Sequence, residues 1–297
     1  DSWLVALPLY HVGGISILFR AILARATVVL PDANKSLIDD INQYKPTHVS
    51  LVATQLTELI NDKNAVAVLQ KMKAILLGGS AIPQSLIEKA HALDLKVYTT
   101  YGSSEMSSQI TTTAPGDSLE RLYTSGILLN YREIKIADDG EILVRGDTLF
   151  KGYIEDGMID PARDSDGYFH TDDIGTIDEF GYLNVIGRKD NMFISGGENI
   201  QPEEIENALL KIEGVADAAV VPVPDSQYGF RPIAFVKLDN SQLSMKDLPE
   251  ILSAKIAKYK IPEAFIDYPN DLEQVGIKIN RSELKKYAIK YFADRES

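Results

Sequence analysis

Apolar residues in the first 115 positions form short runs whose spacing alternates between that of strands and that of helices. Compact apolar stretches such as "TVVL", "THVSLVA" and "KAILLGG" predict buried strands, whereas "ISILFRAILARA", "SLIDDINQY" and "PQSLIEKAHAL" carry apolar residues at helical spacing. Alternation of this kind indicates a parallel sheet with helices packed on it. Ligands of such sheets usually bind beyond the carboxyl ends of the strands, where two glycine- and serine-rich turns fall, at residues 78–80 and 102–105.

The pattern changes twice towards the C-terminus. "REIKIADDGEILVRG" predicts a hairpin with Asp-Gly in its turn, and "GYFHTDDIGTIDEFGYLNVIGR" predicts further short strands. After "GRKDN", an amphipathic helix in "PEEIENALLKI", a helical "SMKDLPEILSAKIAKY", and strands in "ADAAVVPVP", "PIAFVKL" and "VGIKI" predict a compact α+β domain with a terminal helix. We therefore expect an α/β protein whose large domain spans residues 1–189 (α/β in 1–120, a β subdomain in 121–189) and whose small domain spans 190–297.

Composition and charge exclude several classes of function. A chain of 297 residues with 45% hydrophobic and 25% charged residues is typical of a globular protein, and no apolar run approaches the roughly 20 residues that span a bilayer. The net charge of −13 argues against nucleic acid or a membrane surface as a partner attracted by charge. The absence of cysteine excludes disulfides and thiolate catalysis, and fits a cytoplasmic location.

The chain starts at Asp1 with "SWLVALPLYH", which has the pattern of a core strand already under way. This start leads us to expect a fragment of a longer protein. Loss of the preceding part would expose apolar surface, so we also expect self-association into a homo-oligomer or poor solubility.

Two turns of the α/β region carry candidate ligand-binding residues. Gly78 and Gly79 would let backbone approach a flat ligand closely, although a simple helix–strand packing turn explains them as well. In "TTYGSSEMSS", Tyr101 could stack on a purine, Ser104 could contact phosphate, and Glu105 could hold Mg²⁺ together with substrate phosphates. A polar turn without a ligand remains the alternative.

Further candidates lie in the second half of the chain. Asp172 and Asp173 could bind the two hydroxyls of a ribose or form a surface turn. The long mixed run from Ile186 to Glu206, with Arg-Lys-Asp and a Ser-Gly-Gly turn, is harder to explain as packing alone. Lys278, between Ile277 and Ile279, fits an edge strand that lysine protects from pairing with another chain.

Taken in order, these motifs resemble the adenylate-forming acyl-CoA synthetase superfamily, with matches from about Leu7 to Leu284. The superfamily pattern Y-G-x-T-E appears at residues 101–105 with serine in the threonine place, and G-x-x-x-T-G-D appears at 167–173 with aspartate in the glycine place. The pattern G-R-x-D…S-G-G-E-N-I-x-P-x-E-I-E is complete from residue 187 to residue 206. "PLYHVGG", "GGENIQPEEIE" and especially "GIKINR" are most similar to members that activate 2-succinylbenzoate for menaquinone biosynthesis.

The resemblance implies an AMP-forming ligase that uses ATP and Mg²⁺ to convert a carboxylic acid into an acyl-adenylate and then transfers it to coenzyme A. Residues 1–189 would be the C-terminal portion of its AMP-binding large domain, and residues 190–297 its mobile lid. The implied nucleotide contacts are adenine for Gly78, Gly79 and Tyr101, α-phosphate for Ser104, Mg²⁺ for Glu105, both ribose hydroxyls for Asp173, ribose or phosphate for Arg188, and a further cofactor contact for Gly102. His11 would lie near the acid, and Lys278 would catalyse adenylation. Asp190 would be the hinge, and Ser195, Gly196 and Gly197 would line the pantetheine tunnel.

Two departures from the superfamily bear on these expectations. The phosphate loop rich in Ser, Thr and Gly is absent, and no G-x-x-x-x-G-K-[ST] sequence replaces it, so we expect this chain alone to be weak or inactive. The segment after Tyr123 also departs, because Leu128, Asn130 and Tyr131 stand where members of the superfamily usually have prolines and a glycine. The open alternatives are a ligase for a fatty, aryl or amino acid, and a catalytically silent nucleotide-binding module.

Overall fold

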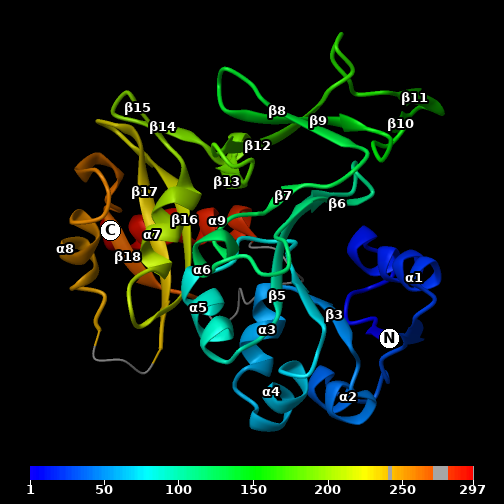
Figure 1. The fold of residues 1–297 in the computed structure, drawn as a ribbon. Helices are drawn as coiled ribbons and strands as arrows, with labels where there is room; N and C mark the ends of the chain where they lie inside the picture. Colours follow the sequence, from blue (N-terminus) through cyan, green and yellow to red (C-terminus); the bar gives the residue numbers. More distant parts are fainter. Residues whose placement is uncertain (240–242, 270–279, 297) are drawn as a thin grey trace. The chain divides into compact units, whose positions relative to one another are not determined.

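A computed structural model describes residues 1–239, 243–269 and 280–296 (Figure 1). The chain forms two compact units. The first comprises residues 1–171 and 175–185, and the second comprises residues 172–174 and 186–297. No helix in the described ranges is long and apolar enough to cross a bilayer.

A seven-stranded sheet in the order β2-β1-β3-β4-β5-β6-β7 organises the first unit. Neighbours among the first five strands are parallel, whereas β6 and β7 add in antiparallel fashion. The parallel sheet is confirmed. The strands are β1 Ser2–Leu4, β2 Thr27–Val29, β3 His48–Leu51, β4 Ala74–Leu77, β5 Val97–Ser103, β6 Ser108–Thr112 and β7 Ile127–Leu128.

Helices connect the parallel strands and bury one large core. Leu4, Val49, Leu51, Ile75 and Leu77 from the strands are buried together with residues of the following helices. Local signals start several of these helices: the Ser36 hydroxyl accepts the Asp39 N–H in a capping box, and Asp62 caps the next-but-one helix. The helices are α1 Val12–Ala24, α2 Leu37–Tyr44, α3 Ala53–Leu59, α4 Lys63–Leu69, α5 Gln84–Ala92 and α6 Leu119–Leu122.

A four-stranded sheet in the order β13-β12-β9-β8 falls within residues 121–189, for which the sequence predicts a β subdomain. Its strands are β8 Arg132–Ile136, β9 Glu141–Gly146, β12 Phe169–Ile177 and β13 Leu183–Arg188. The Asp-Gly hairpin is confirmed, with β8 antiparallel to β9 and Gly140 at φ 86°. A separate hairpin, β10 Tyr153–Glu155 with β11 Met158–Asp160, was not predicted.

A three-stranded sheet, β16-β17-β18, forms the centre of the second unit. Alternate residues of β16 point to opposite faces. Ala218 and Val220 join a core with α7 and α8, and Ala219 and Val221 join a core with α9. The elements are β14 Phe193–Ser195, β15 Glu198–Ile200, β16 Val215–Asp225, β17 Gly229–Leu238, β18 Ala264–Asp267, α7 Pro202–Leu210, α8 Leu248–Ser253, α9 Arg281–Glu296, and the 3₁₀ turns η1 Lys189–Asn191 and η2 Lys258–Lys260.

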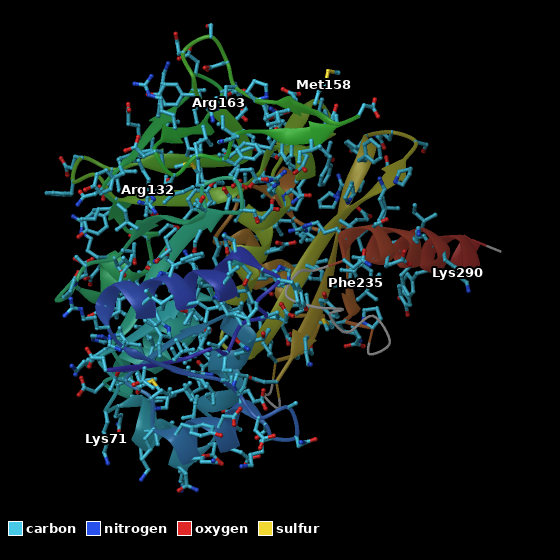
Figure 2. All side chains as sticks on the ribbon, turned by 90° about the vertical axis from the view of Figure 1, so that its right-hand side faces the viewer. Lys71, Arg132, Met158, Arg163, Phe235 and Lys290 are labelled. Atoms are coloured by element: carbon cyan, nitrogen blue, oxygen red, sulfur yellow. The ribbon has the colours of Figure 1, made fainter. Side chains whose placement is uncertain are left out.

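Burial on both faces explains why "ADAAVVPVP" reads as a continuous apolar run. Phe235 of β17 is fully buried (Figure 2). Its ring lies edge-on to that of Tyr287 in α9, with centroids 5.9 Å apart. The helix predicted in "SMKDLPEILSAKIAKY" is shorter than expected: α8 ends at Ser253, and η2 follows. The strand predicted at "VGIKI" lies outside the described residues.

Candidate active site

The turn after β4 lies directly against β5. A Cβ on Gly78 would approach Thr100 Cγ2 to 2.7 Å and the Thr100 carbonyl oxygen to 2.8 Å, so no other residue fits without displacing β5. Gly79 follows with φ 86°, a conformation that favours glycine. Tyr101 is half-buried in the same strand. The two glycines and Tyr101 therefore lie near the carboxyl ends of the neighbouring parallel strands β4 and β5.

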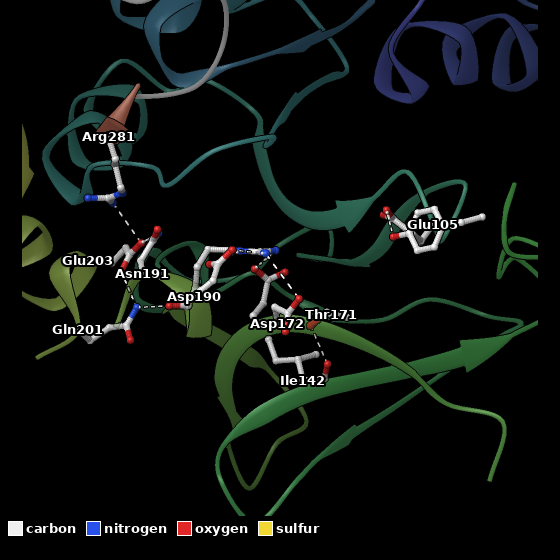
Figure 3. Close-up of polar contacts among 12 residues, drawn as sticks. Glu105, Ile142, Thr171, Asp172, Asp190, Asn191, Gln201, Glu203 and Arg281 are labelled. Atoms are coloured by element: carbon white, nitrogen blue, oxygen red, sulfur yellow. Dashed lines mark hydrogen bonds and ion pairs between the residues drawn. The ribbon is translucent and has the colours of Figure 1, made fainter. Parts of the chain in front are cut away.

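Ser104 and Glu105 form the turn between β5 and β6. Ser104 is exposed. The backbone carbonyl of Glu105 accepts the Phe150 N–H at 2.7 Å, and its carboxylate accepts the Tyr153 hydroxyl at 2.9 Å (Figure 3). These contacts fix the turn and leave a half-exposed carboxylate.

The residues present fit a magnesium ion that is held mainly by substrate. Among the described residues, no group of three or more acids or histidines gathers into a closed metal site. Mg²⁺ commonly uses one or two carboxylates together with substrate phosphates and water, and Glu105 supplies one such carboxylate. When bound, the ion would neutralise phosphate charge.

His11 lies at the N-cap of α1 with extended backbone angles, φ −97° and ψ 145°. Its ring contacts that of Tyr10, with centroids 4.6 Å apart. The ring is exposed at the start of the helix.

Arg188 gathers three carboxylates within the second unit (Figure 3). It forms a two-pronged contact with Asp190, Nε to Oδ1 and Nη2 to Oδ2, both at 3.0 Å. Its Nη1 lies 3.5 Å from Asp173 Oδ1, and its Nη2 lies 3.8 Å from Asp172 Oδ2. The hydrogen bonds from Arg188 hold the pKa of Asp190 below its usual range, and Asp190 in turn raises the pKa of Arg188. The structure thus brings Asp173 of β12 to Arg188 and Asp190, which lie 15 and 17 residues further along the chain.

Ser195, Gly196 and Gly197 form the tip of the β14–β15 hairpin. Ser195 is buried, and the two glycines have φ values of 59° and 89°, as a tight two-residue turn requires. The Gly196 N–H donates to the Tyr228 carbonyl at 2.9 Å, and a Cβ on Gly196 would lie 2.9 Å from Tyr228 Cδ1. Lys278, the predicted catalytic lysine, lies outside the described residues, so its role stays a prediction.

Sequence reasoning missed Arg20, a largely buried cation in α1. Its Nη2 donates to the Ser108 hydroxyl at 3.0 Å, and its guanidinium lies 5.6 Å from the ring centroid of Trp3. Burial, with a smaller contribution from the nearby charge of Arg132, lowers the pKa of Arg20 to about 10. No carboxylate in the described part of the chain pairs with it. The signal available in the sequence was a single charge inside the apolar run "ISILFRAILA".

Family comparison agrees with the motifs and the fold. A model of the AMP-binding enzyme family matches residues 1–154, more than half of the chain, and a model of the AMP-binding enzyme C-terminal domain matches residues 204–274. This chain belongs to the AMP-binding enzymes. The resemblance drawn from its motifs is therefore confirmed at the level of the family.

The chain is similar to 2-succinylbenzoate–CoA ligase of Bacillus subtilis (strain 168), with 35% identity over 296 residues that cover 96% of this chain and 60% of the relative. Two solved structures of o-succinylbenzoate CoA synthetase (MenE) from the same species, one with the acyl-adenylate OSB-AMP and one with ATP and magnesium, have TM-scores of 0.81 and 0.80 at 34% identity. They cover 96% of this chain and 60% and 61% of those chains.

A third solved structure, ATP-bound MatB from Rhodopseudomonas palustris, has a TM-score of 0.87 at 25% identity, covering 98% of this chain and 61% of that one. The chain thus spans about 60% of the length of the curated relatives it matches. The α/β fold class predicted from the sequence is confirmed by these neighbours.

Proposed function

We propose that this chain is part of an acid–thiol ligase that activates 2-succinylbenzoate with ATP and Mg²⁺ and transfers the acyl group to coenzyme A, in menaquinone biosynthesis. The similarity to 2-succinylbenzoate–CoA ligase and to structures with OSB-AMP and with ATP and magnesium supports this reaction. The fold alone does not single out MenE, because MatB has a TM-score at least as high.

The observation that carries the choice of acid is Arg20. Burying a cation without a carboxylate partner costs free energy, so its place is best explained by an anion that arrives with the substrate. 2-Succinylbenzoate has two carboxylates, and activation of one leaves the other charged. Ser108, which accepts from Arg20, is four residues after Ser104. We propose that Arg20 binds this second carboxylate.

Adenylation would proceed at the other carboxylate. Its attack on the α-phosphate brings two anions together, and a fixed ammonium from Lys278 would stabilise the charge that develops and orient both groups. Ser104 would contact the α-phosphate and Glu105 the Mg²⁺. Asp173 would accept the two ribose hydroxyls with support from Arg188, and Gly78, Gly79, Tyr101 and Gly102 would border the adenine.

Thioester formation would use a second set of groups. We propose that Asp190 is the hinge between a large domain of residues 1–189 and a lid of residues 190–297. Rotation about it would replace Lys278 with the hairpin tip at residues 195–197, beside which pantetheine would pass. His11 would lie near the acid. We place this chemistry in the cytoplasm, in line with a chain that lacks cysteine.

Pyrophosphate exchange by the gene product that carries this sequence tests the proposal. With 2-succinylbenzoate as the acid, Lys278→Ala should slow exchange by about 100-fold or more, the scale of one lost oxyanion donor, and should spare thioester formation from supplied adenylate. Equal loss in both half-reactions would show that Lys278 has another role.

Arg20→Gln tests whether Arg20 binds the second carboxylate of 2-succinylbenzoate. One lost charge-assisted hydrogen bond is worth about 1.5–3 kcal/mol, so the KM for 2-succinylbenzoate should rise about 10- to 150-fold, and the KM for an analogue without the second carboxylate should change little. Arg145→Gln is the control, because Arg145 pairs with Glu133 at the surface. A similar rise for both acids would refute the assignment.

A further inference from the structure

The carboxylate of Glu203, in the first turn of α7, accepts hydrogen bonds from three side chains of the second unit (Figure 3). Oε1 accepts from Asn191 Nδ2 at 2.5 Å and from Arg281 Nη2 at 3.1 Å, and Oε2 accepts from Gln201 Nε2 at 2.5 Å. The side chain is only 12% exposed, so water competes weakly for these bonds. A single carboxylate thus joins three segments of the chain.

Two of these donors connect Glu203 to the hinge region around Asp190. Asn191 is the next residue along the chain, in η1. Gln201 also donates to the Arg188 carbonyl at 2.8 Å. A Cβ on Gly187 would lie 2.5 Å from Gln201 Nε2 and 2.6 Å from Glu203 Oε2, so the backbone here packs directly on the two side chains. This close packing explains why the first position of the G-R-x-D pattern is a glycine.

The third segment begins with Arg281, the first residue of α9, three positions after Lys278 in the sequence. Arg281 has its own anchor. Its Nη2 and Nη1 donate to the two oxygens of buried Glu206, and Nη1 also donates to the Val220 carbonyl at 2.8 Å. Loss of the Glu203 carboxylate would therefore remove the contact between Arg281 and the hinge region. Arg281 would keep its pairing with Glu206.

We propose that Glu203 is a positioning residue that holds the start of α9 and the hinge segment 188–191 in one fixed arrangement. The inference deepens the proposed function, because the segment that precedes α9 carries Lys278. Adenylation depends on precise placement of that ammonium, and a displacement of about 1 Å can cost about 100-fold in rate. Glu203 does not contact the reacting atoms.

Glu203→Gln tests whether the three hydrogen bonds of the Glu203 carboxylate hold these segments together, with a side chain of equal size. An amide offers one acceptor oxygen, and its NH₂ would face a donor from Gln201 or from Asn191 and Arg281. Amide hydrogen exchange in residues 187–192 and 281–285 should accelerate in this variant. Glu204→Gln is the matched control, since the adjacent Glu204 pairs with Lys260 at 2.5 Å instead.

Kinetics supply the second readout. In the gene product that carries this sequence, Glu203→Gln should lower kcat for pyrophosphate exchange by about 10- to 100-fold, with KM for ATP and thioester formation from supplied adenylate nearly unchanged. Glu203→Asp, which keeps the charge but shortens the reach, should give an intermediate rate. If Glu203→Gln folds poorly, the same rates measured on Glu203→Asp still test the proposal.

Unchanged hydrogen exchange in Glu203→Gln would overturn the proposal. So would equal loss of both half-reactions, which would indicate a purely structural role. An inactive parent protein would instead count against the proposed function, and the hydrogen-exchange comparison would still decide whether Glu203 ties the two segments.

Discussion

Gly102 lies where β5 and β6 shift register, between Tyr101 and Gly102. A Cβ at this position would lie 1.9 Å from the Ser108 carbonyl oxygen and 2.7 Å from its carbon. These are backbone atoms of a paired strand and cannot move aside as a side chain can. The backbone of β6 therefore excludes a side chain at position 102, independently of any nucleotide.

Gly102→Ala should lower the free energy of unfolding by about 3 kcal/mol, the upper part of the usual cost of overpacking, because β6 must shift. Gly13→Ala is the control: its nearest neighbour is Leu7 Cδ1 at 3.3 Å, and alanine favours the α1 helix. Urea denaturation measures both. Similar stability of the two variants would contradict the crowding argument.

Local sequence patterns pointed to some of these side chains and not to others, for a physical reason. Asp173, Arg188 and Asp190 stand in short local patterns, and the structure brings these three together. Arg20 and Glu203 depend on contacts with residues 88 and 78 positions away, Ser108 and Arg281. No local spacing reports such contacts, so Glu203 resembled an ordinary acid in the first turn of a helix.

Helix α1 is apolar on more than one side. Ile17 and Ala21 are buried, whereas Phe19 is 61% exposed and Leu23 86% exposed. Ile15 and Ile22 are exposed beside them. Contiguous apolar surface of this kind promotes association. The self-association expected from the sequence stays a prediction, and this face is where it can be tested.

Phe19→Ser with Leu23→Ser should reduce self-association and binding of a hydrophobic dye without loss of the fold, because both side chains already face solvent. Analytical ultracentrifugation across a concentration series measures the first effect. Unchanged association would show that another surface is responsible. Leu9→Ser, at an exposed position before α1, is the control for a general gain in solubility.

Elements within apolar runs were predicted even where they are short, as in the three-residue strands β1 and β2, whereas the hairpins β14–β15 and β10–β11 were not. The strands β3 and β4, the helix α1 and the β16–β17 pair have enough buried residues to indicate their period. The three-residue strands β14 and β15 depend on two glycines at positive φ, and β10–β11 exposes Ile154 and Ile159. β10–β11 has no buried residue, and β14–β15 buries only Phe193, Ser195 and Ile200. Three positions are too few for hydrophobic spacing to indicate a strand.

Each unit has a hydrophobic core of its own. Leu77 is fully buried in the core of the seven-stranded sheet, and Leu209 is fully buried between α7 and β16. Independent cores allow independent unfolding, so two thermal transitions are expected rather than one.

Leu77→Ala and Leu209→Ala should each cost about 2–5 kcal/mol through the cavity left behind. In calorimetry, each should lower one transition and leave the other in place. A single transition that both substitutions shift alike would show that the two units unfold together. The pair is matched, since residue type and burial are the same.

The second unit is not one continuous stretch of chain, because residues 172–174 of β12 group with it while their neighbours on both sides group with the first. No single cut in the polypeptide can therefore separate the two units intact. A fragment that begins at residue 186 would keep Arg188 but lose Asp173, its partner at 3.5 Å. A chimaera that exchanges the second unit between relatives should accordingly exchange residues 172–174 as well. Otherwise Arg188 of one protein would have to pair with the β12 strand of the other.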